Sequence, residues 1–125
     1  MPTILYADDD PENRELMHTI FAGENITLLE AIDGHYALEM IKKYRPDLLL
    51  LDLFMPRIDG FGVMKAVKAN STIAYLPIIV LSAWPTGDNR KRAEEYGAID
   101  FIAKPYDPNC LIRIVHKHLS LLKMP

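Results

Sequence analysis

Residues 47–53 read DLLLLDL, four leucines that run into the acidic residue Asp52. A strand with one face in water alternates apolar and polar residues, whereas a strand buried on both faces of a parallel sheet is apolar throughout. This stretch therefore predicts a central strand of a parallel sheet. Asp52 is expected where that strand ends, held rigidly between its two neighbours.

Most of the other apolar runs are also continuous, and stretches with helical spacing lie between them. One strand followed by one helix, repeated five times with short connections, predicts an α/β fold with a five-stranded parallel sheet and helices on both faces. The four remaining runs are TILYA (3–7), ITLLEA (26–31), PIIVLSA (77–83) and AIDFIA (98–103).

Two helix ends carry capping signals. Asp10 is a predicted N-cap with Pro11 at the first helical position, and Gly97 is expected to cap the fourth helix at its C-terminus. Helical spacing also predicts which residues are buried. In the first and last helices these are Leu16, Met17, Ile20, Phe21, Leu111, Ile114, Val115, Leu119 and Leu122.

Composition excludes several classes of protein. The chain has 125 residues, enough for one domain, with an ordinary globular balance of 50% hydrophobic and 25% charged residues. A net charge of −3 gives no general attraction to nucleic acid or anionic membranes. The single cysteine, Cys110, excludes an internal disulfide, no apolar run suits a membrane span, and no signal peptide is recognisable. We expect a small cytoplasmic domain.

Residues with reactive side chains stand at the ends of the predicted strands. Asp8 and Asp9 end the first strand, Asp52 the third and Ser82 the fourth, and Lys104 follows the fifth. In open sheets of this class, ligands bind beyond the carboxyl ends of the strands. These five side chains are therefore expected to converge on one rim.

Three consecutive acids at residues 8–10 raise a question of charge. Two carboxylates about 4 Å apart repel by about 4 kcal/mol at an effective dielectric of 20, so solvent, a proton or a cation must offset the repulsion. Mg²⁺ prefers oxygen ligands and commonly uses one or two carboxylates plus phosphate oxygens. Asp8, Asp9 and Asp52 offer such a site, and Asp10 is left to cap the helix.

The same groups suit phosphoryl chemistry. A carboxylate beside a divalent ion can attack phosphorus and form an acyl phosphate, and Asp52 is the best candidate for this nucleophile. The Lys104 ammonium group would neutralise phosphoryl oxygens, and the Ser82 hydroxyl would donate a hydrogen bond to one. This pattern indicates a phosphoacceptor.

Four stretches now carry a family resemblance: ILYADDDPENRELM (4–17), PDLLLLDLFMPRIDGFGVM (46–64), PIIVLSA (77–83) and YGAIDFIAKPYDP (96–108). In their order and spacing, they resemble the response-regulator receiver domains of two-component signalling, of the single-domain type seen in chemotaxis regulators. The resemblance covers nearly all of the chain, so we expect residues 1–125 to form a single receiver domain. It implies a flavodoxin-like fold with strand order 2-1-3-4-5.

The resemblance also implies a role for each site residue. Asp9, with Asp8 beside it, would bind Mg²⁺ (or Mn²⁺ in its place), and the backbone carbonyl of Phe54 would complete the metal shell. Asp52 would accept a phosphoryl group from a histidine kinase or phosphotransfer protein. Ser82 would move toward that group.

Further positions are implied near the end of the chain. Lys104 would pair with the phosphoryl group, and the Lys104–Pro105 peptide bond would be cis. Phe101 would hold the aromatic switch position and turn inward on phosphorylation. The face formed by the fourth helix, fifth strand and fifth helix would then contact a downstream protein, with no nucleic acid bound directly. Catalysis would be limited to assisted autophosphorylation and slow autodephosphorylation.

Three residues depart from the usual family pattern. Phe101 replaces the more usual Tyr, so it offers no hydroxyl on the outer face. Phe54 and Trp84 are bulky at positions that flank the path of water toward the phosphoryl group, and we hypothesise that this apolar rim slows dephosphorylation. An exposed Trp84 is equally consistent with a partner contact.

Two rival functions belong to other classes. A phosphohydrolase with an aspartyl nucleophile normally has a second acid two residues on, where this chain has Phe54. A receiver-like interaction module that works without phosphorylation remains the alternative, although the full set of site residues disfavours it. The chain is either a stand-alone regulator or part of a longer protein, and Met1 at the family's usual start suggests that nothing large precedes it.

Overall fold

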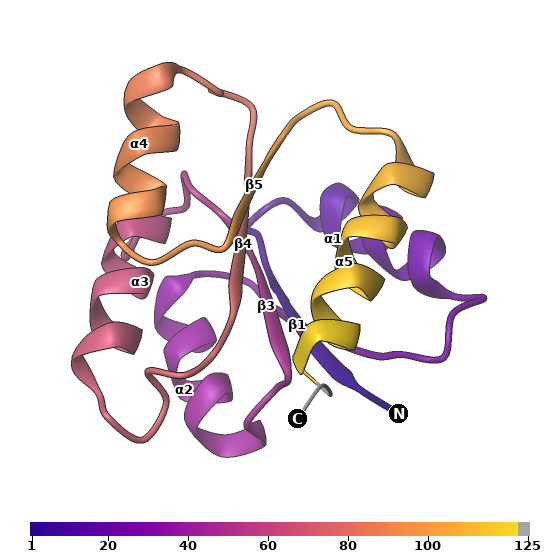
Figure 1. The fold of residues 1–125 in the computed structure, drawn as a ribbon, viewed down its shortest axis with the longest axis horizontal. Coiled ribbons are helices and arrows are strands. Elements are labelled where there is room, and N and C mark those ends of the chain that lie inside the picture. Colours follow the sequence, from indigo (N-terminus) through magenta and orange to yellow (C-terminus); the bar gives the residue numbers. More distant parts are fainter. Residues whose placement is uncertain (123–125) are drawn as a thin grey trace.

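The computed structural model describes residues 1–122 as a parallel sheet between two layers of helices (Figure 1). The strand order is β2-β1-β3-β4-β5, and every pairing is parallel, which confirms the predicted flavodoxin-like α/β fold. The elements are β1 (Thr3–Ala7), α1 (Pro11–Phe21), β2 (Thr27–Ala31), α2 (Gly34–Tyr44), β3 (Leu48–Asp52), α3 (Gly60–Ala69), β4 (Ile78–Ser82), α4 (Gly87–Glu95), β5 (Asp100–Ala103) and α5 (Pro108–Leu122).

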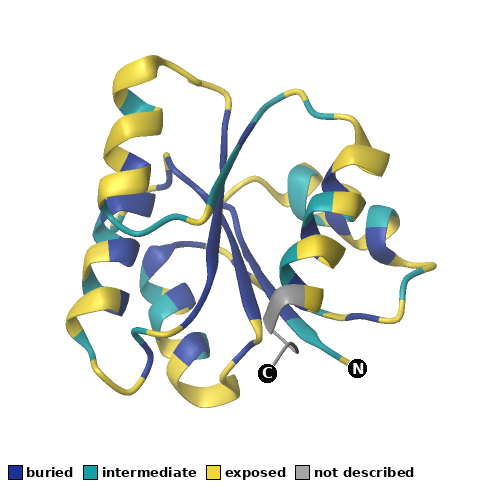
Figure 2. Cartoon of the chain, in the orientation of Figure 1, coloured by how far each residue is buried: buried dark blue, intermediate teal, exposed yellow. Residues whose placement is uncertain are grey.

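Strand β3 lies at the centre of the core, as its sequence predicts. Its leucines alternate between two clusters: Leu49 and Leu51 pack with α2, α3 and α4, while Leu48 and Leu50 pack with α1 and α5. Figure 2 shows the central strands buried between helices whose outer faces are exposed. Both faces of β3 are covered, and for this reason its sequence is continuously apolar rather than alternating.

The strand register brings the reactive residues to one edge of the sheet. Strand β3 pairs with β1 on one side and β4 on the other, with Asp52 opposite Leu81. Ser82 at the end of β4 lies opposite Ala103 at the end of β5, so Lys104, the next residue, lies just beyond the sheet near Ser82. The carboxyl ends of β1, β3, β4 and β5 therefore form a common rim.

The helix signals are confirmed in part. Asp10 caps α1 and accepts a hydrogen bond from the Glu12 backbone N–H at 2.9 Å. The C-cap of α4 is Tyr96, one residue before the predicted Gly97, and Gly97 adopts a positive φ of +104° directly after the cap. Among the described residues, no helix is both long and apolar enough to cross a membrane.

The predicted buried face of α1 is wrong at one position. Leu16 is 49% exposed, whereas Met17 and Phe21 are buried. The core contact of α1 is a narrow stripe with a spacing of four residues, and Leu16 lies beside that stripe. Of the last helix, Leu111, Val115 and Leu119 are buried as predicted, and the side chain of Leu122 lies outside the described residues.

Candidate metal centre

An open cleft of about 300 Å³ lies at the carboxyl ends of the central strands. The loops after β1, β3, β4 and β5 supply most of its walls, and the start of α1 supplies the rest. The residues that line it are Asp8, Asp9, Asp10, Asn13, Asp52, Phe54, Ala83, Trp84 and Lys104. The sequence predicted six of these as functional residues and Asp10 as a helix cap.

Three carboxylates converge in this cleft. Asp8, Asp9 and Asp52 each offer an oxygen atom, and these atoms all lie within 4.8 Å of one another. Asp8 and Asp52 are buried, while Asp9 is exposed to solvent. Clustered oxygen donors of like charge, two of them withdrawn from water, suit a hard divalent cation such as Mg²⁺.

The Asp8 carboxylate is fully buried and has hydrogen bonds on both oxygens. Its Oδ1 accepts from the Asp10 backbone N–H at 2.9 Å. Its Oδ2 accepts from the Tyr6 hydroxyl at 2.5 Å, from Asn13 Nδ2 at 3.1 Å and from Lys104 Nζ at 3.2 Å. A carboxylate has about four acceptor positions, so the protein alone occupies most of the hydrogen-bonding capacity of Asp8.

Lys104 bridges two of the buried acids. Its Nζ lies 3.2 Å from Asp8 Oδ2 and 3.7 Å from Asp52 Oδ1. The pKa of Asp52 is raised to about 6, first by desolvation on burial and then by the charges of Asp8 and Asp9, against the opposing effects of Lys104 and of a hydrogen bond from the Phe54 backbone. The Asp52 carboxylate is therefore only partly neutralised by the groups around it, and a bound cation would complete the balance.

The remaining predicted residues take different positions around the cleft. Ser82 is fully buried, its Oγ accepts from the Trp84 backbone N–H at 3.0 Å, and its side chain does not line the cleft. Phe54 and Trp84 do line it, with 45% and 65% of their surfaces exposed. The cleft thus has an acidic floor and two exposed aromatic residues on its rim.

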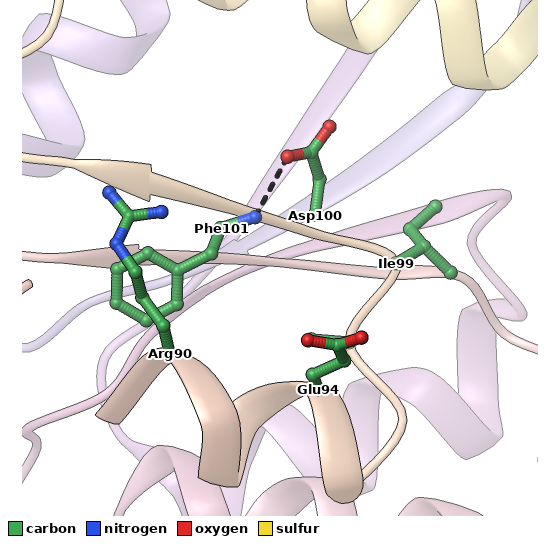
Figure 3. Close-up of a pocket in the computed structure, with 6 residues that line it drawn as sticks. Arg90, Glu94, Ile99, Asp100 and Phe101 are labelled. Carbon is green, nitrogen blue, oxygen red and sulfur yellow. Dashed lines mark hydrogen bonds between the residues drawn. The ribbon is translucent and has the colours of Figure 1, made fainter. Parts of the chain in front are cut away.

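Phe101 lies apart from the acids, in a groove of about 360 Å³ between α4 and β5 (Figure 3). The Arg90 guanidinium lies over its ring, 4.7 Å from the centroid, and the Phe101 backbone N–H donates to Asp100. Phe101 also packs against the cluster on the α2–α4 side of the sheet. The Lys104–Pro105 peptide bond, between Phe101 and α5, is cis.

Sequence reasoning missed two residues whose side chains donate to the Asp8 carboxylate, Tyr6 and Asn13. Tyr6 looked like an ordinary member of a buried strand. Side chains two residues apart on a strand point to the same face, however, so the spacing of Tyr6 and Asp8 could have indicated the contact. Asn13 lies in the first turn of α1, next to the cleft, where only the fold places it.

Comparison with known proteins agrees with this geometry. Residues 4–116 match the family model described as the response regulator receiver domain, and the chain therefore belongs to that family. It is 39% identical over 107 residues to the response regulator GtcR of Aneurinibacillus migulanus, a match that covers 85% of this chain and 43% of that protein. It is 34% identical over 115 residues to an uncharacterised 14.6 kDa protein of Leptolyngbya boryana, covering 92% of this chain and 88% of that protein.

Solved structures show the same relationship. A receiver domain of a signal transduction histidine kinase from Syntrophus aciditrophicus superimposes with a TM-score of 0.91 at 28% identity, over 100% of this chain and 95% of that one. The chemotaxis protein CheY4 of Vibrio cholerae gives 0.87 at 26% identity, over 94% and 98% of the two chains. The chain spans less than half the length of some curated relatives, such as GtcR, and most of the length of the Leptolyngbya boryana protein.

Proposed function

We propose that this receiver domain is a phosphorylation-dependent switch in which Asp52 accepts a phosphoryl group and a partner protein reads the resulting change of surface. One observation carries the proposal. Three carboxylates within 4.8 Å of one another meet at the rim of the sheet, and Lys104 Nζ lies 3.7 Å from Asp52 Oδ1. The receiver family consists typically of phosphoacceptors rather than enzymes, which supports this reading of the site.

Asp9, Asp52 and the Phe54 backbone carbonyl would hold a Mg²⁺ or Mn²⁺ ion, with Asp8 behind them. When bound, the ion supplies positive charge to the phosphoryl oxygens and to the crowded carboxylates. Among the three acids, Asp8 is the least free to ligate directly because Tyr6 and the other donors occupy its oxygens.

Asp52 would act as the nucleophile. One of its carboxylate oxygens forms a bond to phosphorus while the phosphorus–nitrogen bond of a donor phosphohistidine breaks, and the departing imidazole takes a proton from water. Strand β3 holds Asp52 in place for this attack because the strand pairs with β1 on one side and with β4 on the other. Lys104 is close enough to contact the new phosphoryl oxygens after a small movement.

Ser82 and Phe101 would transmit the change. The Ser82 hydroxyl accepts from the Trp84 backbone N–H, so a movement of Ser82 toward a phosphoryl oxygen would act directly on the β4–α4 loop. Phe101 and Arg90 line the groove beside α4, so a change of the Phe101 rotamer would alter that surface. Phosphorylation biases an equilibrium of this kind rather than creating it.

Membership of the receiver family implies a histidine kinase as the phosphoryl source. A phosphotransfer protein is the other candidate donor. We propose that the downstream target is a protein that contacts the face formed by α4, β5 and α5, with no direct role for nucleic acid. We also propose that residues 1–125 form a single receiver domain with slow dephosphorylation of its own.

The intact mass after incubation with a small-molecule phosphodonor tests this function. With Mg²⁺, the parent chain should gain the mass of one phosphoryl group, and Asp52→Asn or removal of Mg²⁺ should abolish the gain. The matched control is Asp47→Asn, an acid at the opposite end of β3. No gain in the parent, from either a small donor or a histidine kinase, together with no Mg²⁺ binding, would contradict the proposal and favour a phosphorylation-independent interaction module.

A further inference from the structure

One oxygen of Asp8 is unusually crowded. Its Oδ2 accepts from the Tyr6 hydroxyl at 2.5 Å, from Asn13 Nδ2 at 3.1 Å and from Lys104 Nζ at 3.2 Å. Two of these donors are neutral and the third is a cation at the end of a long side chain. Because Asp8 is fully buried, losing a donor is costly. Asp8 therefore competes with Asp52 for the Lys104 ammonium group.

Lys104 is shared between Asp8 and the proposed phosphoacceptor. Its Nζ is closer to Asp8 Oδ2, at 3.2 Å, than to Asp52 Oδ1, at 3.7 Å. A phosphoryl group on Asp52 adds strong acceptor oxygens that would draw Lys104 away from Asp8. The cost of that movement depends on which donors stay behind at Asp8.

We propose that Tyr6 is a positioning residue whose hydroxyl keeps Asp8 hydrogen-bonded while Lys104 leaves it for the phosphoryl group on Asp52. This inference rests on the phosphoacceptor function proposed above. Without the hydroxyl, Asp8 would retain Lys104 more strongly, and the phosphorylated form would be disfavoured. Among the described residues, Asn13 would then be the only neutral side-chain donor left on Oδ2.

The placement of Tyr6 suits this role better than that of Asn13. Tyr6 is 1% exposed and packs among the residues between the sheet and helices α1 and α5, so its ring cannot turn away without disturbing the core. Its phenol hydroxyl is a hydrogen-bond donor at neutral pH, and it points at Asp8 Oδ2. Asn13 is only partly buried, and its bond is longer.

Tyr6→Phe removes the hydroxyl and leaves the ring. The probe is beryllofluoride, a mimic of the phosphoryl group, bound in the presence of Mg²⁺ and followed by the fluorescence of Trp84, the single tryptophan, which lines the cleft. We expect beryllofluoride affinity to fall about five- to tenfold, in keeping with a hydrogen bond to a charged group. Mg²⁺ affinity measured alone should stay the same or rise, because Asp8 becomes less neutralised.

Tyr106→Phe is the matched control, since Tyr106 lines the neighbouring groove with Tyr6 but makes no hydrogen bond to Asp8. It should change neither affinity. A second test uses a Lys104→Met background, in which Tyr6→Phe should alter beryllofluoride affinity by less than about twofold because the competition no longer exists. If this double variant does not fold, a loss of beryllofluoride affinity without a loss of Mg²⁺ affinity in Tyr6→Phe alone still decides the question.

The outcomes separate the two proposals. Failure of the parent chain to bind beryllofluoride with Mg²⁺ would overturn the phosphoacceptor function, and this inference with it. Normal binding by the parent and by Tyr6→Phe alike would overturn the role of Tyr6 alone. A loss of both Mg²⁺ and beryllofluoride affinity in Tyr6→Phe would also overturn it, because general loosening of the site predicts that result.

Discussion

At the scale of single residues, the buried carboxylate of Asp52 makes stability depend on pH. Its pKa of about 6 in the folded chain lies above the usual 3.8, so the folded state binds the proton more tightly than the unfolded state. The contribution of the protonated group to stability is present below about pH 4 and is lost as the pH rises through about 6. The ionised Asp52 carboxylate therefore lowers the stability of the folded protein at neutral pH.

Asp52→Asn should therefore stabilise the metal-free protein at pH 7.5, by about 2–3 kcal/mol, and have little effect at pH 4. Urea unfolding at both pH values measures the difference. Mg²⁺ should reduce the gain at pH 7.5, because bound cation stabilises only the parent. Equal stabilisation at the two pH values would show that the effect comes from packing rather than from charge.

The aromatic rim concerns two further residues, Phe54 and Trp84, which line the cleft with largely exposed side chains. If they limit access of water to the phosphoryl group, polar replacements should shorten its lifetime. We expect Phe54→Asn and Trp84→Glu each to speed dephosphorylation, by about three- to tenfold, well short of a dedicated general base. Decay of labelled phosphoprotein measures this, and unchanged decay in both variants would refute the hypothesis.

At the scale of elements, the contact between α4 and β5 holds Phe101 at the groove. The Arg90 guanidinium lies 4.7 Å from the Phe101 centroid, a cation–π contact worth about 0.5–1 kcal/mol at an exposed site. Arg90→Ala removes this contact and should favour the inward rotamer, so Mg²⁺-dependent beryllofluoride affinity should rise about two- to fivefold.

Lys91→Ala is the control for Arg90→Ala, because it removes a neighbouring exposed cation of α4 that makes no contact with Phe101. It should leave the affinity unchanged, and salt titration would separate any general charge effect. Equal affinities in the parent and Arg90→Ala would mean that Arg90 does not hold the switch in its present position.

The start of α3 is packed tightly against the end of β3. A Cβ atom on Gly60 would lie 2.8 Å from the Asp52 carbonyl oxygen and 2.8 Å from Leu53 Cα, so the backbone that carries Asp52 would have to shift. Gly60→Ala should destabilise the protein by about 1–3 kcal/mol and weaken Mg²⁺ binding. Denaturant unfolding and a Mg²⁺ titration check both expectations.

Gly87→Ala provides the control for that prediction. Gly87 begins α4 as Gly60 begins α3, but a Cβ atom there meets nothing within 4 Å. Stability should therefore stay within about 0.5 kcal/mol or rise slightly, because alanine restricts the unfolded chain. Similar losses in the two variants would indicate a helix-start effect rather than the close approach of α3 to β3.

At the scale of the whole molecule, the parallel α/β fold and the acids at its edge could be predicted from periodic patterns, while the strand order and the places of Phe54 and Trp84 came from the family resemblance. The buried leucines of β3 and the acids at strand ends follow from burial on both faces and from parallel topology. Asn13 could not be assigned to the site in the same way, since its contact with Asp8 depends on where α1 docks, whereas the Tyr6 contact follows from a two-residue spacing on β1 that the apolar pattern of the strand obscured. Leu16 was misplaced because helical spacing does not fix the width of the buried stripe.

The proposed roles of the site residues describe a switch that links the acidic cleft to a second surface. The acids lie at the carboxyl edge of the sheet, while Phe101 and Arg90 lie in the groove between α4 and β5 (Figure 3). Ser82 is the last residue of β4, and Lys104 follows β5, the strand that carries Phe101. If the domain is such a switch, a ligand bound at Asp52 must change the structure of the groove between α4 and β5.

Amide NMR spectra of the parent chain, recorded with Mg²⁺ before and after addition of beryllofluoride, test this requirement most directly. We predict large shifts at Asp52 and also at Arg90 and Phe101 in the groove between α4 and β5, with neither set of shifts in Asp52→Asn. Shifts confined to the cleft, with Arg90 and Phe101 unchanged, would contradict it.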